Sequence, residues 1–205
     1  MSHPVVNPPA VKNAGSRLGA EDVVERALEW FLDGRRIDMQ QLASELGIGR
    51  ATLYRWWGSK ERLTGEVVWR IMHDAIRRLE SRGRGTPDQR LVRDLDRLAA
   101  TVRTFEPLAQ FVSQDPEHAL RVLTSDHSVT QRHAIDWVAG RLRAIPGIDH
   151  GIGIDDLAYT IIRIVESFVW TDMITGDPPR PERAAEMVAL LISAAMQPSS
   201  NREKR

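Results

Sequence analysis

The feature that most constrains this chain is residues 38–63, where glycines divide the sequence into two short helical patterns. One pattern follows Asp38, a residue type that often caps helix N-termini, and the other covers residues 50–57. A Gly-Ile-Gly turn separates them and Gly58 ends the second, because glycine readily adopts the backbone conformations of tight turns and helix ends. Two short helices joined by such a turn predict a helix-turn-helix.

The second of these helices has the two faces that a DNA recognition helix needs. At 100° per residue, Leu53 and Trp57 lie together on one side, which predicts that they belong to the core. The opposite side carries small and cationic residues, as entry into a major groove requires, and Arg55 has the fork that matches guanine. Lys60 starts the next helix, where an anion is favoured. The predicted DNA-binding residues are Arg50, Ala51, Thr52, Tyr54, Arg55, Trp56 and Lys60.

The charge of the chain is unevenly distributed along the sequence. Lysine plus arginine and aspartate plus glutamate both number 28, so the formal net charge is zero. The segment from Gly47 to Lys60 nevertheless holds three cations and no acid, whereas the first predicted helix, from about Glu21 to Asp33, is acidic. This pattern argues against DNA binding over the whole surface and favours a small, local site.

The chain is predicted to be all-α, because nearly every segment after residue 20 has helical periodicity and none alternates like a strand. Helix starts are expected after Thr86, Asp115 and Ser128, and the last two helices over about residues 155–174 and 181–196. We predict an N-terminal three-helix helix-turn-helix DNA-binding domain joined to a C-terminal helical ligand-binding and dimerisation bundle. The expected boundaries are a disordered arm 1–18, a DNA-binding domain 19–66, an effector-binding and dimerisation domain 67–197, and a flexible tail 198–205.

The stretch DMQQLASELGIGRATLYRWWGSKERL resembles the signature of the tetracycline-repressor (TetR) family of regulators. In that family a Thr-Leu-Tyr core and a Ser-Lys pair stand at this spacing. The resemblance is dense over residues 38–63 and looser in the surrounding helices. It implies phosphate contacts for Thr52, Tyr54 and Lys60.

Two positions depart from the family pattern. Trp56 stands where the family usually has histidine, so a phosphate contact there comes from the indole N–H or is lost. Asp38 stands where the family usually has threonine, and it still caps the helix but would repel a nearby phosphate. These departures shift the expected contacts towards Arg50, Thr52, Tyr54, Arg55 and Lys60.

The helix expected over residues 155–174 is apolar on two sides, which indicates burial on both. One side can line the interior of the protomer while the other meets a second subunit in a four-helix bundle. A core helix of a monomer is the alternative, and the family resemblance favours the homodimer. The predicted dimer residues are Leu157, Ile161, Ile164, Phe168, Ala184, Val188, Leu191 and Ala195.

An apolar effector chamber is expected inside this bundle, because aromatic residues recur along its helices. Glu166 stands out, since a carboxylate on an apolar face needs a partner. Its partner is either Arg163 or another arginine in a salt bridge, or an effector. His118 and His133 lack metal-ligand spacing, and neither a metal nor another cofactor is expected. The predicted effector-binding residues are Phe105, Phe111, Trp137, Tyr159, Ile162, Glu166, Trp170 and Met173.

The segments RIVESFVWTDMITG and RATLYRWWGSKERL also resemble regulators of the QsdR type, a subgroup associated with control of lactone-signal degradation. This resemblance implies that the effector is a lactone with an acyl tail, such as a γ-lactone or an acyl-homoserine lactone.

These features predict a transcriptional repressor that binds a palindromic double-stranded DNA operator and is released by a small, largely apolar effector. The alternatives are an activator or a protein-interaction adaptor on the same fold.

An enzyme is not expected, because no nucleophile–base pair, paired carboxylates or metal cluster can be identified. The absence of cysteine excludes disulfides and thiol catalysis. Neither a membrane span nor a signal peptide is evident, so we expect no membrane association and a cytoplasmic location.

Overall fold

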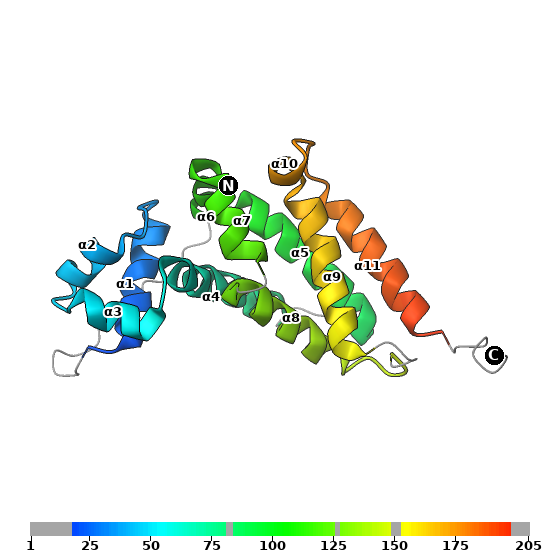
Figure 1. Ribbon diagram of the computed structural model, residues 1–205. Coiled ribbons are helices and arrows are strands. Elements are labelled where there is room, and N and C mark those ends of the chain that lie inside the picture. Colours follow the sequence, from blue (N-terminus) through cyan, green and yellow to red (C-terminus); the bar gives the residue numbers. More distant parts are fainter. Residues whose placement is uncertain (1–17, 81–83, 126–127, 149–152, 198–205) are drawn as a thin grey trace, which may run out of the picture.

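The computed structural model describes residues 18–80, 84–125, 128–148 and 153–197, and these ranges contain eleven helices and no strand (Figure 1). The all-α prediction is therefore confirmed. Apart from Leu18, the predicted arm 1–18 and tail 198–205 lie outside the described residues.

Three short helices form a head at one end of the molecule (Figure 1). They are α1 (Ala20–Leu32), α2 (Met39–Glu45) and α3 (Arg50–Trp57). Asp38 caps α2, since its Oδ1 accepts a 2.8 Å hydrogen bond from the backbone N–H of Gln41. Gly58 ends α3 with a φ of 73°, a conformation that glycine adopts without steric cost. The local signals in the sequence thus define these helices as predicted.

A long helix, α4 (Lys60–Glu80), runs from the head into the body and crosses the boundary expected between residues 66 and 67. The helices of the body are α5 (Pro87–Thr104), α6 (Glu106–Gln114), α7 (Pro116–Thr124), α8 (Val129–Leu142), α9 (Ile154–Val169), α10 (Thr171–Ile174) and α11 (Pro181–Ala195). Thr86 starts α5 in a capping box with Gln89, as the sequence predicted. The sequence prediction did not include α6, which follows the extended residue Phe105.

Two hydrophobic cores hold the helices together. One begins in the head around Leu42 and Leu53, follows α4 through Val67, and reaches the middle of the body at Trp170. The other lies between α5, α8, α9 and α11, with Ile161 among its fully buried residues. Head and body therefore share a continuous apolar interior along α4.

The single helix expected over residues 155–174 is interrupted at Trp170, which corrects the sequence prediction. Hydroxyl groups next to the break bond backbone carbonyls of the preceding turn: Thr171 Oγ1 donates to Ser167 O at 2.7 Å and Ser167 Oγ to Ile164 O at 2.8 Å. Such contacts bend helices. The break places Trp170 at a corner between α9 and α10.

Candidate nucleic-acid interface and ligand cavity

The recognition helix α3 exposes the face that was predicted to enter a groove. Its exposed residues are Arg50, Ala51, Tyr54 and Arg55, and Thr52 and Trp56 are partly exposed. On the opposite side Leu53 is 0% exposed, and Trp57 donates its indole N–H to the carbonyl oxygen of Ala20 at 3.2 Å. Leu53 and Trp57 therefore anchor α3 to α1, and the other face is left free for a ligand.

The cations of this surface have no acidic partner within the described ranges. Among the residues that the structure describes, no ion pair joins Arg50, Arg55 or Lys60 to a carboxylate, whereas Glu21 on α1 pairs with Arg70 at 2.6 Å. At the start of α4, Ser59 Oγ accepts a hydrogen bond from the N–H of Arg62 at 3.1 Å, so Ser59 caps this helix. The unpaired positive charge suits contact with a phosphate backbone.

The two departures from the family pattern have clear positions. The partly buried Trp56 packs against the apolar core of the head, so its indole body is structural as well as surface-facing. The Asp38 carboxylate is engaged at the N-terminus of α2, as the hydrogen bond to Gln41 shows.

A small cavity of about 70 Å³, here called the inner cavity, lies in the body between α4, α5, α8 and α9. Its walls are apolar except for Thr130, Gln131 and Glu166, which gather on one side. The apolar lining residues are Trp69, Met72, Ile76, Leu95, Leu98, Ala99, Val102, Leu123, Ala134, Trp137, Ile162, Val165, Val169 and Trp170. An apolar hollow with a few converging polar groups is the usual form of a small-molecule site.

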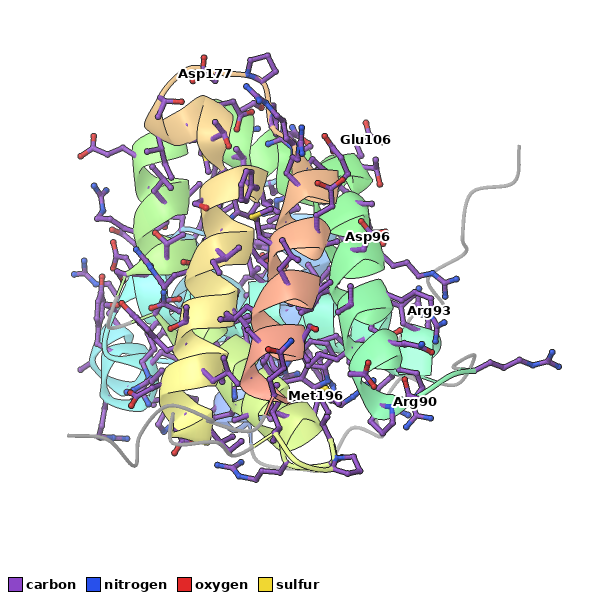
Figure 2. The ribbon with its side chains drawn as sticks, turned by 90° about the vertical axis from the view of Figure 1, so that its right-hand side faces the viewer. Arg90, Arg93, Asp96, Glu106, Asp177 and Met196 are labelled. Atoms are coloured by element: carbon purple, nitrogen blue, oxygen red, sulfur yellow. The ribbon has the colours of Figure 1, made fainter. Side chains whose placement is uncertain are left out.

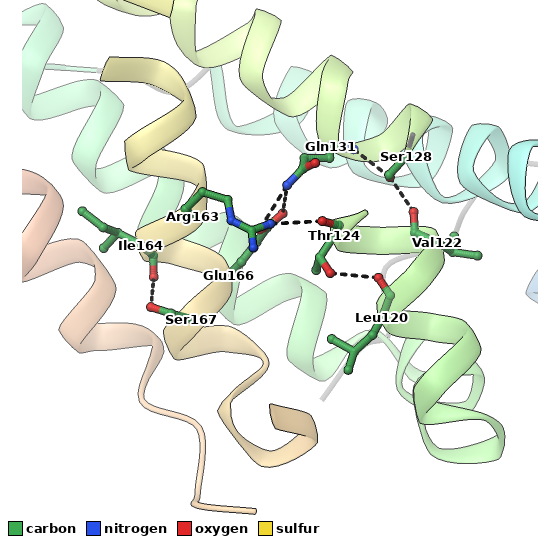
Figure 3. Close-up of polar contacts among 9 residues, drawn as sticks. All are labelled: Leu120, Val122, Thr124, Ser128, Gln131, Arg163, Ile164, Glu166 and Ser167. Carbon is green, nitrogen blue, oxygen red and sulfur yellow. Dashed lines mark hydrogen bonds and ion pairs between the residues drawn. The ribbon is translucent and has the colours of Figure 1, made fainter. Parts of the chain in front are cut away.

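The polar side of the inner cavity is centred on Glu166 (Figure 3). Gln131 Nε2 donates to both carboxylate oxygens at 3.3 Å, and Arg163 Nη1 donates to Oε2 at 2.8 Å. The same Arg163 nitrogen reaches Thr124 O at 3.0 Å and so ties α9 to the end of α7. Burial raises the pKa of Glu166 to about 7, against the opposing effects of the Arg163 charge and the hydrogen bonds. Arg163 is thus the partner of Glu166 expected from the sequence, and Glu166 lines the cavity as well.

The predicted effector residues divide into two groups. Those that line the inner cavity are Trp137, Ile162, Glu166 and Trp170. The other four lie elsewhere: Phe105 lines a groove beside α1, Phe111 a cleft between head and body, and Met173 a cavity near α10. Tyr159 is 51% exposed on the outside of α9. These four side chains lie outside the inner cavity, and their part in effector binding stays a prediction.

Sequence reasoning missed the walls supplied by α4 and α5 and the polar partner Gln131. Trp69 is the one missed residue with a visible signal, as a tryptophan within the amphipathic α4, and it stacks on His133 at 4.9 Å. Gln131 occupies the first turn of α8, where nothing in the sequence indicates that it meets Glu166 on α9.

Most residues of the predicted dimer set lie inside the protomer, and their part in a dimer stays a prediction. The following residues of that set are buried inside one protomer: Leu157, Ile161, Ala184, Val188 and Ala195. Ile164, Phe168 and Leu191 are partly buried. The reason is that α9 and α11 pack on each other and on α5 and α8 through this side, which is the more apolar one.

The outer face of α9 and α11, which is turned to the viewer in Figure 2, carries other apolar residues. Leu190 is 63% exposed and Met187 37% exposed on α11, and Met196 follows at its end. Tyr159 belongs to the exposed side of the neighbouring α9.

Within the described residues, no group of three or more His, Cys, Asp and Glu side chains is arranged to hold a metal ion. None of the described helices has the length and apolar content to cross a bilayer. His118 is buried in α7, and burial lowers its pKa below the ordinary value, with the Lys60 charge acting in the same direction.

Known proteins show the same architecture. A family model described as "Tetracyclin repressor-like, C-terminal domain" matches residues 86–193. The TetR-family transcriptional repressor QsdR from R. erythropolis is similar in structure, with a TM-score of 0.78 at 21% identity, over 85% of this chain and 94% of that one. The TetR-family repressor AlkX from a Dietzia strain, implicated in biodegradation of n-alkanes, gives a TM-score of 0.55 at 15% identity, over 88% and 97%. Among curated proteins, none is significantly similar in sequence.

Proposed function

The chain belongs to the tetracycline-repressor (TetR) family of DNA-binding transcriptional regulators, whose C-terminal domain model matches more than half of it, and from this premise we propose that it is a homodimeric repressor released from a palindromic operator by a small, largely apolar effector. The observation that carries the DNA-binding part is α3, which buries Leu53 and presents on its free face arginines that form no ion pair with any described residue.

Each exposed residue of the head has a chemical role in this proposal. Arg55 reads a base edge, since its guanidinium can donate two hydrogen bonds to guanine, and small Ala51 lets the helix approach the groove floor. Thr52 and Tyr54 bind phosphates on the groove walls, and Lys60 binds a phosphate at the start of α4. Arg50, at the start of α3, reaches a base or a phosphate. Trp56 is left with a minor role because it is partly buried.

The outer face of α9 and α11 is proposed as the dimer seam, in place of the buried residues expected from the sequence. Exposed Leu190 and Met187 support this, because large apolar side chains gathered on one surface mark an interaction site. A two-fold axis there would present two α3 helices to successive major grooves, with operator half-sites one or more helical turns apart.

The inner cavity is proposed as the site that recognises the polar part of the effector. A lactone carbonyl only accepts hydrogen bonds, and Gln131 Nε2 and a protonated Glu166 are donors that face the cavity. Because the pKa of Glu166 is raised to about 7, a large fraction of these carboxyl groups carries a proton at neutral pH. The lactone class itself comes from the sequence resemblance.

The long helix α4 is proposed as the link between effector and operator. Its Trp69, Met72 and Ile76 line the inner cavity, and its first turn carries Lys60. An effector that favours another position of α4 changes the spacing of the two heads. Operator binding must then weaken effector binding by the same factor.

The experiment that tests this function is selection of bound duplexes from a random DNA pool, followed by release assays with a lactone panel. We expect a palindromic consensus and lactone-dependent release. A chain that selects no sequence would be an adaptor, and one that turned over a lactone would be an enzyme; either outcome would refute the proposal. Binding without release by any effector would favour the activator alternative.

A further inference from the structure

The inner cavity is too small for a lactone with an acyl tail. Its volume is about 70 Å³, and because a single water needs roughly 10–15 Å³ of this kind of volume, it holds a group of only about five heavy atoms. Sites that enclose whole ligands measure on the order of 300–1,000 Å³. A lactone ring fills the inner cavity, so a tail must lie elsewhere.

A larger cavity adjoins it near α10. This outer cavity is an open depression of about 420 Å³ between α5, α6 and the α9–α10 corner, and Ala109, Pro116 and Asp172 at its edge are exposed. Val102 and Trp170 line both cavities, so the two cavities adjoin at these side chains. The remaining apolar residues of the outer wall are Ala109, Val112, Pro116 and Met173.

The polar groups of the outer cavity are paired with protein groups. Arg103 donates to both carboxylate oxygens of Asp172, at 3.2 and 2.9 Å, and to Val169 O at 3.4 Å. Ser113 donates to Gln110 O within α6 at 3.0 Å. The outer cavity therefore offers apolar surface to an alkyl chain. Thr130, Gln131 and Glu166 of the inner cavity are also bonded within the protein, so a polar ligand group there must share or replace these bonds.

We propose that the effector is an elongated amphiphile that occupies both cavities. Its polar end lies at Gln131 and Glu166, and its alkyl chain passes Val102 and Trp170 into the outer cavity. This inference rests on the proposed function and adds to it a chain-length requirement, since only ligands longer than the inner cavity gain contacts beyond Trp170.

Titration calorimetry with homologous series tests this directly. The probes are γ-butyrolactones with side chains from methyl to decyl, N-acyl-homoserine lactones of matching tails, and straight-chain alcohols. For the wild-type chain the affinity is expected to rise about fourfold per added methylene, which corresponds to ~0.8 kcal/mol per buried CH₂. The rise continues beyond the length that the inner cavity alone can hold.

Two matched variants test where the alkyl chain of the ligand lies. Ala109→Trp fills the outer cavity from an exposed position on α6, and Ala100→Trp places the same side chain on an exposed site of α5 that lines neither cavity. We expect Ala109→Trp to weaken the binding of long-chain ligands at least tenfold and to leave the binding of short-chain ligands unchanged. Ala100→Trp should leave the affinity for both groups of ligands unchanged.

The inference would be overturned if wild type and Ala109→Trp showed the same dependence of affinity on ligand chain length. It would also be overturned if no ligand of any series bound. The operator selection described above uses no effector, so its outcome is independent of this one. A chain that selects an operator but shows no chain-length dependence would refute only the two-cavity site.

Discussion

Thr130 Oγ1 donates a 2.9 Å hydrogen bond to the carbonyl oxygen of Gly65, and this contact joins the wall of the inner cavity to the helix that leaves the head. Thr130 is buried in the first turn of α8 and lines the cavity. A Cβ at Gly65 would lie 3.5 Å from Thr130 Oγ1 and from Val129 Cβ. The two helices thus meet closely, one turn after Lys60, where a change in the cavity can reach α4.

Replacing Thr130 by valine removes this hydrogen bond and keeps the shape of the side chain. We expect the free energy of unfolding in urea to fall by about 1 kcal/mol, the usual net contribution of such a bond, and the effector to weaken operator binding by a smaller factor than in wild type. Thr130→Ser keeps the hydroxyl and is the control. A valine variant with unchanged stability and coupling would show that the contact is incidental.

Lys60→Ala tests the phosphate contact at the start of α4. Lys60 has no ion pair among the described residues, so its loss removes a charge that is available to DNA. We expect weaker binding to all duplexes alike and a salt dependence, log K against log[salt], that is shallower by about one. Arg143→Ala, at the far end of α8, removes a cation outside the head and should leave the slope unchanged. An unaltered slope for Lys60→Ala would exclude the contact.

The raised pKa of Glu166 makes the stability of the protein depend on pH. Below the ordinary value of 4.5 the carboxyl is protonated in both the folded and the unfolded state, and no penalty arises. As the pH rises from there to about 7, the unfolded chain loses the proton while the folded one keeps it, so stability falls. Above about pH 7 the loss of stability due to Glu166 no longer increases.

Glu166→Gln abolishes this dependence, because an amide does not titrate. Relative to wild type, we expect its unfolding free energy to increase on going from pH 4.5 to pH 8 by on the order of 2–3 kcal/mol, measured by urea unfolding across the range. Glu117→Gln, on an exposed side chain, is the matched control. If the unfolding free energy of Glu166→Gln and of wild type changed with pH in the same way, burial would not be holding the proton on Glu166.

Leu190→Arg tests the proposed dimer seam. Leu190 is 63% exposed, so arginine there costs the isolated protomer little, but it places a charge in the centre of a two-fold interface. We expect the dimer to dissociate to monomers in analytical ultracentrifugation, with the helical circular dichroism unchanged. Leu18→Arg changes another exposed leucine, in the head, and should leave the dimer intact. Dimers that persist in Leu190→Arg would place the seam elsewhere.

The head could be predicted from the sequence because its signals are local. Asp38 caps α2 through a group three residues away, and Gly58 stops α3 through its own backbone angle. Leu53 was expected in the core from its angular position alone, and it is fully buried. No long-range information was needed for these assignments.

The body could not be predicted at the same level, since its details depend on packing between distant segments. Both sides of α9 are apolar, and only contacts with α5, α8 and α11 decide that Ile161 faces inward and Tyr159 outward. Gln131 meets Glu166 across 35 residues of sequence. The corner at Trp170 is also spanned by the distant Arg103, whose hydrogen bonds reach Val169 and Asp172.

The central claim, sequence-specific DNA binding through α3, is tested most directly by one measurement. This is fluorescence anisotropy of the selected operator and of a scrambled duplex at the same salt concentration, for wild type and for Arg55→Ala. We predict that wild type binds the operator at least about a thousandfold more tightly than the scrambled duplex. Arg55→Ala should lose about 1–3 kcal/mol on the operator and little on the scrambled duplex. Equal affinity of the wild-type chain for the two duplexes would contradict the account.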